Sequence, residues 1–381
     1  MRFLCEIGDL YRYFSKSNLD ARRITFYAES AFYYRYFEGY INYILKNSNY
    51  DICYVTSDAN DPIFKDKKPR IKKFYSNLLF SFIAMFTDAR VLIYTMEALG
   101  NFHIKRSIKS GAEHIFAFHG PYSTTMVHVK EAFDYYDTIF CIGSYQKEEI
   151  RKREQLYSLR SKNLVEIGYP YLDELASEYS RENSIVENNT VLIAPSWHEG
   201  NIFETCMIPI VKNLLKAGFK VIARPHDELL KRKPKIIYGI RDYFKSEQSF
   251  SVDLDLRNNN SVCSADILIT DWSGISFEWA LVRERPVLYI NTKTKIKNSD
   301  YMELGITPIE IQTRNILGKS LDIECLDKIG ECAKDLLRNR ELYAEEIVKF
   351  REKNFYNWKN SAQAGGQYIL AALDKDVKLD K

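Results

Sequence analysis

The 381-residue sequence predicts an α/β protein with two doubly wound domains that face a cleft, followed by C-terminal helices. Short apolar runs alternate with helical segments in both halves of the chain, and a polar stretch over 177–189 separates the halves. The length also exceeds that of one average domain. We expect an N-terminal domain at 1–180, a second domain at 190–320 and C-terminal helices over 321–381.

The first half alternates strands and helices. Its apolar runs predict strands at Ile24–Tyr27, Asp51–Thr56, Val91–Thr95, Ile115–Phe118, Thr138–Ile142 and Val165–Ile167. Its longer segments predict helices at Ala31–Leu45, at Tyr75–Phe86, and from a cap at Ser144 to Glu154.

The second half repeats this alternation. Strands are expected at Val191–Ala194, Phe219–Ala223, Ile267–Ile269 and Pro286–Ile290. A helix over Phe203–Ala217 carries its apolar residues on one face and stops at Gly218. Another helix begins with Phe277 and Glu278, and two or three more follow from Leu321.

Composition excludes several classes of protein. A net charge of +3 gives no general affinity for nucleic acid. The seven cysteines include no C-x-x-C pair, which favours reduced thiols in a cytosolic protein over disulfides or zinc. The apolar run near Leu78–Phe86 is too short to span a membrane, and charge interrupts the N-terminus too early for a signal peptide. We expect no cofactor and no metal.

The sequence from Thr270 to Glu278, Thr-Asp-Trp-Ser-Gly-Ile-Ser-Phe-Glu, joins a buried strand to a helix. In a βαβ unit such a turn lies at the carboxyl end of a parallel sheet, where helix N–H groups bind phosphate. Ser273, Gly274 and Ser276 are therefore candidate phosphate ligands, most simply for a nucleotide. Glu278 lies one helical turn further on, where it either accepts the ribose hydroxyls or only complements the helix dipole. Asp271 is better explained as a turn residue.

Three of the six histidines, His119, His198 and His226, directly follow predicted parallel strands. Strand ends line the ligand crevice of doubly wound sheets, which makes these histidines site candidates. His119 precedes Gly120 and suits a general base, because the pKa of histidine lies near neutrality. Arg224 and His226 form a cationic pair that can neutralise a diphosphate without a metal. Trp197 either stacks on a base or simply packs.

The basic stretch Lys65–Lys73 precedes the predicted apolar helix Tyr75–Phe86. Such a pair is typical of a segment lying on an anionic membrane surface, and equally of a solvated loop before a core helix. The tyrosine-rich segment Phe32–Tyr43 leaves the same two alternatives open.

Taken together, four motifs in this order resemble those of the CDP-glycerol glycerophosphotransferases, which include teichoic-acid primases, polymerases and related capsule enzymes. The motifs are His119-Gly120, Ala194-Pro-Ser-Trp197, Arg224-Pro-His226 and Thr270–Glu278. The resemblance covers roughly residues 90–315 and implies a GT-B fold. It also implies a CDP-alditol donor, typically CDP-glycerol, whose glycerol-bearing phosphorus is attacked by an acceptor hydroxyl so that CMP leaves.

The resemblance also implies roles for individual residues and a location in the cell. His119 would be the base, and His226 with Arg224 would bind the pyrophosphate. Trp197 and His198 fall in the donor-site motif, Ser273, Gly274 and Ser276 would bind phosphate, and Glu278 would bind the ribose. Such enzymes work peripherally on the cytoplasmic face of the cell membrane, on polyprenyl-linked saccharides.

Two departures from the family pattern lie in the donor motifs. Gly274 stands where family members often have a second serine, and Ser196-Trp197-His198-Glu199 stands where they often carry Arg-Asp after the tryptophan. Two other functions therefore stay open. One is a GT-B glycosyltransferase that builds a surface polysaccharide from a nucleotide sugar. The other is a membrane-surface scaffold without catalysis.

Overall fold

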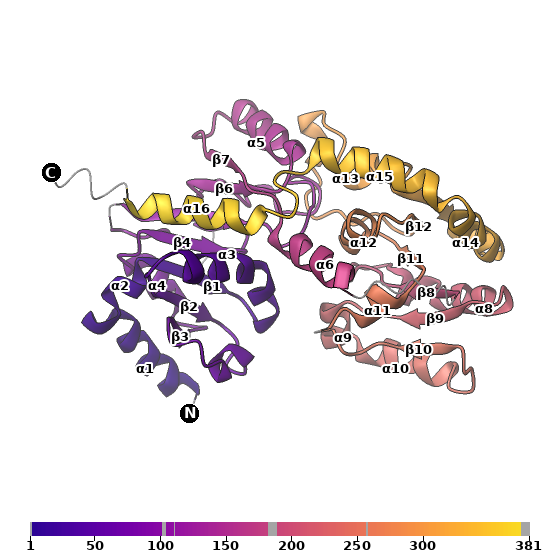
Figure 1. Cartoon of the computed structure of the whole chain (residues 1–381), viewed down its shortest axis with the longest axis horizontal. Helices are drawn as coiled ribbons and strands as arrows, with labels where there is room; N and C mark the ends of the chain where they lie inside the picture. The colour runs from indigo at the N-terminus through magenta and orange to yellow at the C-terminus, as the bar shows by residue number, and fades with distance from the viewer. Residues whose placement is uncertain (1, 101–103, 110, 182–188, 257, 375–381) are drawn as a thin grey trace. The chain divides into compact units, whose positions relative to one another are not determined.

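The computed structural model describes residues 2–100, 104–109, 111–181, 189–256 and 258–374. The chain forms two compact units (Figure 1). The first comprises Met1–Glu174, Asp300–Leu304 and Phe355–Lys381, and the second comprises Leu175–Ser299 and Gly305–Asn354. The segment expected as a group of C-terminal helices is thus divided between them. Helices α14 (Ile329–Arg338) and α15 (Arg340–Asn354) belong to the second unit, and α16 (Ser361–Asp374) belongs to the first.

The first unit contains a seven-stranded parallel sheet in the order β3-β2-β1-β4-β5-β6-β7. Its strands are β1 (Ile24–Ala28), β2 (Ile52–Thr56), β3 (Ile71–Tyr75), β4 (Val91–Tyr94), β5 (Glu113–Ala117), β6 (Thr138–Cys141) and β7 (Asn163–Glu166). Its helices are α1 (Arg2–Phe14), α2 (Leu19–Arg22), α3 (Tyr34–Asn47), α4 (Phe80–Phe86), α5 (Ser144–Leu156) and α16, with 3₁₀ turns η1 (Lys16–Asn18), η2 (Ala31–Tyr33), η3 (Pro62–Lys65) and η4 (Tyr301–Leu304). Helix α6 (Pro170–Arg181) begins in this unit and continues into the second.

Helices α3 and α16 pack together against the sheet of the first unit (Figure 1). Phe37 and Ile41 of α3 and Ile369 of α16 are fully buried in the core that they share with the strands. The two helices approach closely because α16 has a glycine at the contact. A Cβ atom on Gly365 would lie 2.2 Å from a ring carbon of Tyr40. The last helix therefore completes the core of the first unit.

The second unit contains a six-stranded parallel sheet in the order β10-β9-β8-β11-β12-β13. Its strands are β8 (Thr190–Ile193), β9 (Lys220–Ala223), β10 (Phe250–Val252), β11 (Ile267–Thr270), β12 (Val287–Asn291) and β13 (Gly318–Asp322). Its helices are α7 (Ile202–Thr205), α8 (Met207–Lys216), α9 (Asp227–Arg232), α10 (Pro234–Tyr243), α11 (Asn260–Ser264), α12 (Ile275–Arg283), α13 (Ile309–Gln312), α14 and α15, with the 3₁₀ turn η5 (Ile323–Lys328).

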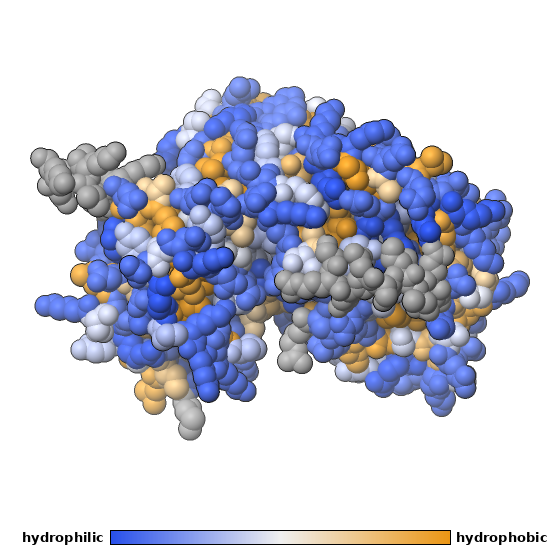
Figure 2. Space-filling model, in the orientation of Figure 1, coloured by the Kyte–Doolittle hydropathy of each residue, from blue (hydrophilic) through white to orange (hydrophobic). Residues whose placement is uncertain are grey.

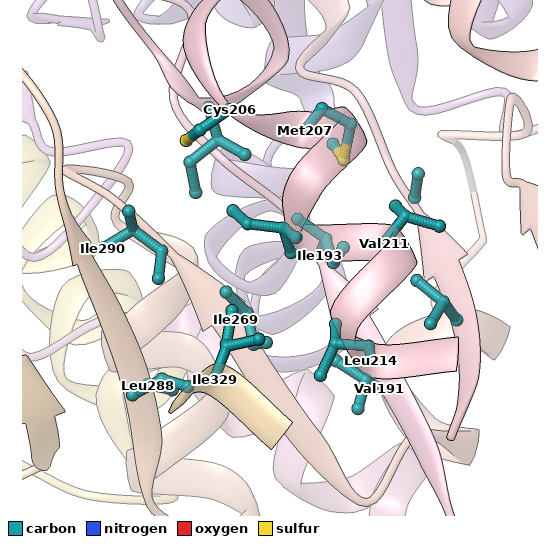
Figure 3. Packing of buried hydrophobic residues seen from close by; sticks show 14 of the residues in the cluster. Val191, Ile193, Cys206, Met207, Val211, Leu214, Ile269, Leu288, Ile290 and Ile329 are labelled. Carbon is teal, nitrogen blue, oxygen red and sulfur yellow. The ribbon is translucent and has the colours of Figure 1, made fainter. Parts of the chain in front are cut away.

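The core of the second unit lies between its central strands and the helices α8 and α14 (Figure 3). Ile193 of β8, Ile269 of β11 and Leu288 of β12 meet Leu214 of α8 and Ile329 of α14. Continuous apolar runs are typical of parallel strands that are buried on both faces. The central strands expected from the sequence are therefore confirmed.

Three local expectations are wrong. Residues up to Tyr75 form strand β3, and the helix that follows starts only at Phe80. The helix expected over Phe203–Ala217 is broken at Cys206, whose φ of −144° is not helical, into α7 and α8. The N-cap of α5 is Gly143 rather than Ser144.

The polar stretch 177–189, which was expected to separate the two halves, is only partly described by the structure. Its residues up to Arg181 continue α6, and residues 182–188 lie outside the described residues.

The basic stretch Lys65–Lys73 is engaged in local contacts. Arg70 donates to the carbonyl oxygens of Leu45 at 2.7 Å and Ser48 at 2.9 Å, and Lys72 pairs with Asp51 at 3.0 Å. These contacts tie the stretch to the end of α3 and to the sheet edge. Within the described residues, no helix has the length and apolar character needed to cross a membrane.

Candidate functional site

His119 lies in the loop that follows β5 of the first unit, among aromatic rings. The imidazole centroid is 5.5 Å from that of Tyr33, 5.9 Å from that of Tyr36 and 5.9 Å from that of Tyr122. The hydroxyl of Tyr169 donates to the His119 carbonyl oxygen at 3.0 Å. The aromatic residues and this hydrogen bond hold the main chain and the ring at the end of the strand, and the side chain stays partly exposed.

Gly120 is required here by the close approach of a side chain. A Cβ atom at this position would lie 2.1 Å from two ring carbons of Tyr122 and 2.4 Å from its hydroxyl oxygen. The Tyr122 phenol therefore packs directly on the main chain beside His119. Any residue other than glycine would displace it.

Glu149 of α5 anchors the loop after His119. Its carboxylate accepts hydrogen bonds from the Ser123 hydroxyl at 2.8 Å, the Thr124 amide at 2.6 Å and the Thr124 hydroxyl at 2.7 Å. Burial raises the pKa of Glu149 to about 7, although these hydrogen bonds oppose the rise. Sequence reasoning missed Glu149 because it lies in a helix of mostly charged residues, typical of a solvated surface.

The turn after β11 in the second unit is organised by the buried carboxylate of Asp271. One carboxylate oxygen accepts from the Ser196 amide at 2.7 Å and the Trp272 amide at 2.6 Å, and the other accepts from the Ile202 amide at 3.2 Å. Burial raises the pKa of Asp271, and the amide hydrogen bonds oppose the rise. Asp271 therefore joins the loops after β8 and β11, in the turn role expected for it.

Helix α12 begins immediately after this turn, with Gly274 at its N-cap. The amides of Ser273, Gly274 and Ile275 donate to no acceptor among the residues that the structure describes. Ser276 is buried, and its hydroxyl donates to the Ser273 carbonyl oxygen at 3.0 Å. Unpaired amides at the start of a helix are groups that can bind a phosphate, and the Ser276 hydroxyl is hydrogen-bonded within the turn. Glu278 is half-buried in the first turn of α12.

Arg224, which follows β9, is buried and hydrogen-bonded to residues between β10 and α11 and to α11 itself. Its guanidinium contacts Asp253 Oδ2 at 2.8 Å, the Ser261 hydroxyl at 2.9 Å and the Asn258 carbonyl oxygen at 2.8 Å. These acceptors compensate the burial of the charge. In this structure the Arg224 guanidinium is thus used in contacts within the second unit.

His226 caps helix α9. Its Nδ1 atom accepts from the Glu228 amide at 3.1 Å, so in this arrangement the ring proton is on Nε2. The Trp197 and His226 ring centroids are 6.3 Å apart. The Arg232 guanidinium lies 5.4 Å, and the Lys295 ammonium 5.9 Å, from the Trp197 ring centroid. An aromatic surface, a histidine donor and two cations are therefore gathered in one place.

His198 connects two loops of the second unit. Its Nε2 atom donates to the Lys293 carbonyl oxygen at 2.6 Å, which ties the loop after β8 to the loop after β12. Burial lowers the pKa of His198, although Asp271 and this hydrogen bond act in the opposite direction. The lowered pKa favours the neutral imidazole, and the hydrogen bond to the carbonyl oxygen puts a proton on Nε2.

Arg314 was missed by sequence reasoning, yet it supports the same turn. Its guanidinium donates to the carbonyl oxygen of Asp271 at 2.9 Å and to Asn291 Oδ1 at 2.8 Å. It also lies 4.3 Å from the ring centroid of Trp272 and 4.6 Å from that of Tyr289. Burial lowers the pKa of Arg314 to about 10. No local pattern marks this residue, because its partners Asp271, Ile290 and Asn291 lie more than 20 residues away in the chain.

In the second unit, the structure places the predicted residues at the carboxyl ends of neighbouring strands. Trp197 and His198 follow β8, Arg224 and His226 follow β9, and the turn from Ser273 follows β11. His119 occupies the corresponding place after β5 in the sheet of the first unit. Strand ends of this kind form the ligand sites of doubly wound sheets.

Comparison with known proteins identifies the family and the fold. Residues 10–296 match the family described as CDP-Glycerol:Poly(glycerophosphate) glycerophosphotransferase. Over 181 residues, 45% of the chain, the sequence is 24% identical to the teichoic acid glycerol-phosphate primase of Bacillus subtilis, and the match spans only 44% of that protein.

Two solved structures share the fold. A wall teichoic acid polymerase TagF structure has a TM-score of 0.64 at 17% identity, over 97% of this chain and 93% of its own. The UDP-GlcNAc 2-epimerase of Neisseria meningitidis has a TM-score of 0.61 at 13% identity, over 91% of this chain and 99% of its own. The two-unit α/β architecture is therefore that of the GT-B fold.

Proposed function

The chain belongs to the CDP-glycerol:poly(glycerophosphate) glycerophosphotransferase family, and from this premise we propose its reaction. It transfers glycerol phosphate, or a related alditol phosphate, from a CDP-alditol to a hydroxyl of a lipid-linked saccharide or polymer. CMP is released, and the product enters a teichoic-acid or capsule-like surface polymer. The observation that carries the proposal is the row of unpaired amides over 273–275, next to the loops that hold the family's motif residues.

The donor's diphosphate binds at the N-terminus of α12. The amides of Ser273, Gly274 and Ile275 and the Ser273 hydroxyl donate to phosphate oxygens, favoured by the helix dipole. His226 donates its Nε2 proton to the same group, since its Nδ1 atom is used in capping α9. Arg224 acts as a positioning residue, because its guanidinium is hydrogen-bonded to Asp253 and to the Asn258 carbonyl oxygen.

The nucleoside binds to residues around the same turn. Trp197 offers a partly exposed aromatic face for the base, with Arg232 and Lys295 nearby to balance the negative charge of the phosphates. Glu278, half-buried on the first turn of α12, accepts hydrogen bonds from the ribose hydroxyls. Ser276 keeps the turn in shape through its bond to the Ser273 carbonyl oxygen.

His119 is the general base of the transfer. Its imidazole accepts the proton of the acceptor hydroxyl as that oxygen attacks the phosphorus that carries the alditol. The bond from this phosphorus to the oxygen that bridges it to CMP breaks, and CMP leaves with the electron pair. The amides of the α12 turn stabilise the negative charge that develops on the phosphate oxygens.

A membrane surface is the proposed location of the acceptor, and helix α1 carries the contact. Phe3, Leu4, Ile7 and Tyr11 are 52%, 72%, 44% and 80% exposed and recur at the helical spacing of one face. Hydrophobic side chains gather at the N-terminal end of this helix, at the lower left of Figure 2. A large exposed apolar stripe of this kind is typical of a helix lying in the membrane interface.

Helix α4 extends the apolar stripe of α1. The buried carboxylate of Glu6 in α1 accepts from the amides of Asn77 and Leu79, each at 2.6 Å, which fixes α1 beside the turn that leads into α4. Leu78 in this turn is 72% exposed, and Phe82 of α4 is 51% exposed. We place the peripheral contact with the inner face of the cell membrane here, in addition to the basic stretch Lys65–Lys73.

Transfer of a sugar from a nucleotide sugar is the second candidate function. The α12 turn and Glu278 would serve a nucleotide sugar equally well, and the epimerase with the same fold was solved bound to UDP-GlcNAc. Binding measurements separate the two donors. Calorimetry with CDP-glycerol, CDP-ribitol, UDP-glucose and CMP should show preference for a CDP-alditol and weaker binding in Ser273→Ala. The control is Ser251→Ala, an exposed serine of β10 in the same unit. Preference for UDP-glucose would overturn the proposed donor.

A further inference from the structure

Three polar atoms around the α12 turn are buried without a partner. Ser196 Oγ, His198 Nδ1 and Thr292 Oγ1 make no hydrogen bond to any described residue. Ser196 is 1% exposed and Thr292 is 6% exposed. A buried polar atom left unpaired loses its hydrogen bonds to water without replacing them, which destabilises the fold. Three such atoms in neighbouring loops therefore indicate a place that a ligand completes.

A continuous set of hydrogen bonds joins the three residues. The amides of Ser196 and Trp272 both donate to Asp271 Oδ1, at 2.7 and 2.6 Å. The Trp272 indole donates to the Thr292 carbonyl oxygen at 3.2 Å. The next residue, Lys293, accepts from His198 Nε2 at 2.6 Å. The loops after β8 and β12 are thus both hydrogen-bonded to the pair Asp271 and Trp272. These two residues directly precede the unpaired amides at 273–275.

The atoms define what a ligand must offer. A carbonyl oxygen only accepts, so His198 Nε2 carries a proton. Burial lowers the pKa of His198, which favours the neutral ring, and in the neutral ring Nδ1 presents a lone pair. That lone pair needs an O–H or N–H donor. The two hydroxyls donate or accept, and the helix amides only donate. A fully ionised phosphate satisfies the amides but has no proton for His198.

We propose that Ser196, His198 and Thr292 bind hydroxyl groups of the donor that lie next to its phosphates, and that His198 accepts from one of them. This assignment rests on the proposed function. Alditol hydroxyls and ribose hydroxyls share this chemistry. The three residues then form hydrogen bonds with the hydroxylated part of the donor, while the α12 amides bind its phosphate.

Side-chain replacements that remove or keep individual hydrogen-bonding groups test the assignment. His198→Gln keeps an N–H donor in the position of Nε2 and removes the acceptor at Nδ1, whereas His198→Asn offers an acceptor in the position of Nδ1. Thr292→Val removes only the hydroxyl and preserves the shape. Binding is measured by calorimetry with CDP-glycerol, with the CDP ethyl ester, which lacks the alditol hydroxyls, and with 2′,3′-dideoxy-CDP-glycerol.

We expect His198→Gln and Thr292→Val to weaken CDP-glycerol binding about tenfold each, the loss of one hydrogen bond, and His198→Asn to restore part of it. If the CDP ethyl ester is unaffected by the replacements, the alditol supplies the hydroxyl. If the dideoxy compound is unaffected, the ribose supplies it. Either result supports the assignment.

Equal losses on all three ligands, or no loss on any, would overturn the assignment. Wild-type protein that binds CDP-glycerol no better than CMP would instead contradict the proposed function, and the assignment would fall with it. Thermal unfolding of each variant shows that the fold is kept, and Ser251→Ala serves as the unaffected control.

Discussion

The buried carboxylate of Glu149 accepts both the amide and the hydroxyl of Thr124, at 2.6 and 2.7 Å. A single side chain of α5 thereby fixes the loop that begins with His119. The same carboxyl group has a pKa raised by burial from 4.5 to about 7. The loop that carries the proposed base is thus held by a group that titrates near neutral pH.

The raised pKa of Glu149 predicts a pH-dependent stability. Because the folded protein favours the protonated carboxyl, this contribution is fully present below about pH 4.5 and is lost as the pH rises through 7. The stability of wild type relative to Glu149→Gln should fall by roughly 3 kcal/mol between pH 5 and 8. Urea unfolding at both pH values measures it. A difference that does not change with pH would contradict the raised pKa.

Gly120→Ala should displace Tyr122 and disturb His119, because the new Cβ atom would meet the phenol ring at 2.1 Å. We expect transfer to fall at least tenfold while CDP-glycerol binding is kept, since the proposed donor residues belong to the second unit. Gly239→Ala is the control, with no atom within 4 Å of the added methyl group. Unchanged turnover in Gly120→Ala would show that the packing of Tyr122 does not matter.

Arg224→Gln should destabilise the second unit by about 3 kcal/mol, because it removes the cation that pairs with the largely buried carboxylate of Asp253. The exposed Arg241→Gln should change stability by less than about 0.5 kcal/mol. Thermal unfolding compares the two. If Arg224→Gln keeps wild-type stability and loses only donor binding, Arg224 contacts the diphosphate directly and is not a positioning residue.

Leu4→Glu should weaken binding to vesicles that contain anionic lipid at least tenfold, because it places a charge in the apolar stripe of α1. Leu342→Glu is the matched control, at a leucine 67% exposed on α15 of the second unit. Vesicle sedimentation measures both. Equal binding by the two variants would remove α1 from the proposed membrane contact.

The strands that sequence analysis missed share one property. β3, β10 and β13 all lie at sheet edges, where one side of the strand has no neighbour. Their sequences Ile-Lys-Lys-Phe-Tyr, Phe-Ser-Val and Gly-Lys-Ser-Leu-Asp include exposed or half-exposed positions, so they lack the apolar run that marks a central strand. The central strands were predictable because burial on both faces leaves a continuous hydrophobic signal.

The residues of the candidate site also divide into those that the sequence could predict and those that it could not. The turn from Ser273 was predictable because strand, turn and helix are adjacent in the sequence. Arg314 and Glu149 were not, because each reaches its partners only after folding, 43 residues away for Asp271 and 25 for Thr124. The hydrogen bonds of Arg224 to Asp253 and Ser261 could not be predicted for the same reason, because these partners follow about 30 residues later in the chain.

Product analysis of one reaction tests the central claim most directly. The protein is incubated with CDP-glycerol and a short prenyl-diphosphate-linked saccharide, and the products are identified by mass spectrometry and ³¹P NMR. We predict CMP and a new phosphodiester, with transfer reduced about 10²- to 10⁴-fold in His119→Ala while CDP-glycerol binding is kept. Near-normal turnover in His119→Ala would contradict the proposal that His119 is the general base. Failure to use CDP-glycerol, with a glycosidic bond formed from a nucleotide sugar instead, would contradict the reaction itself.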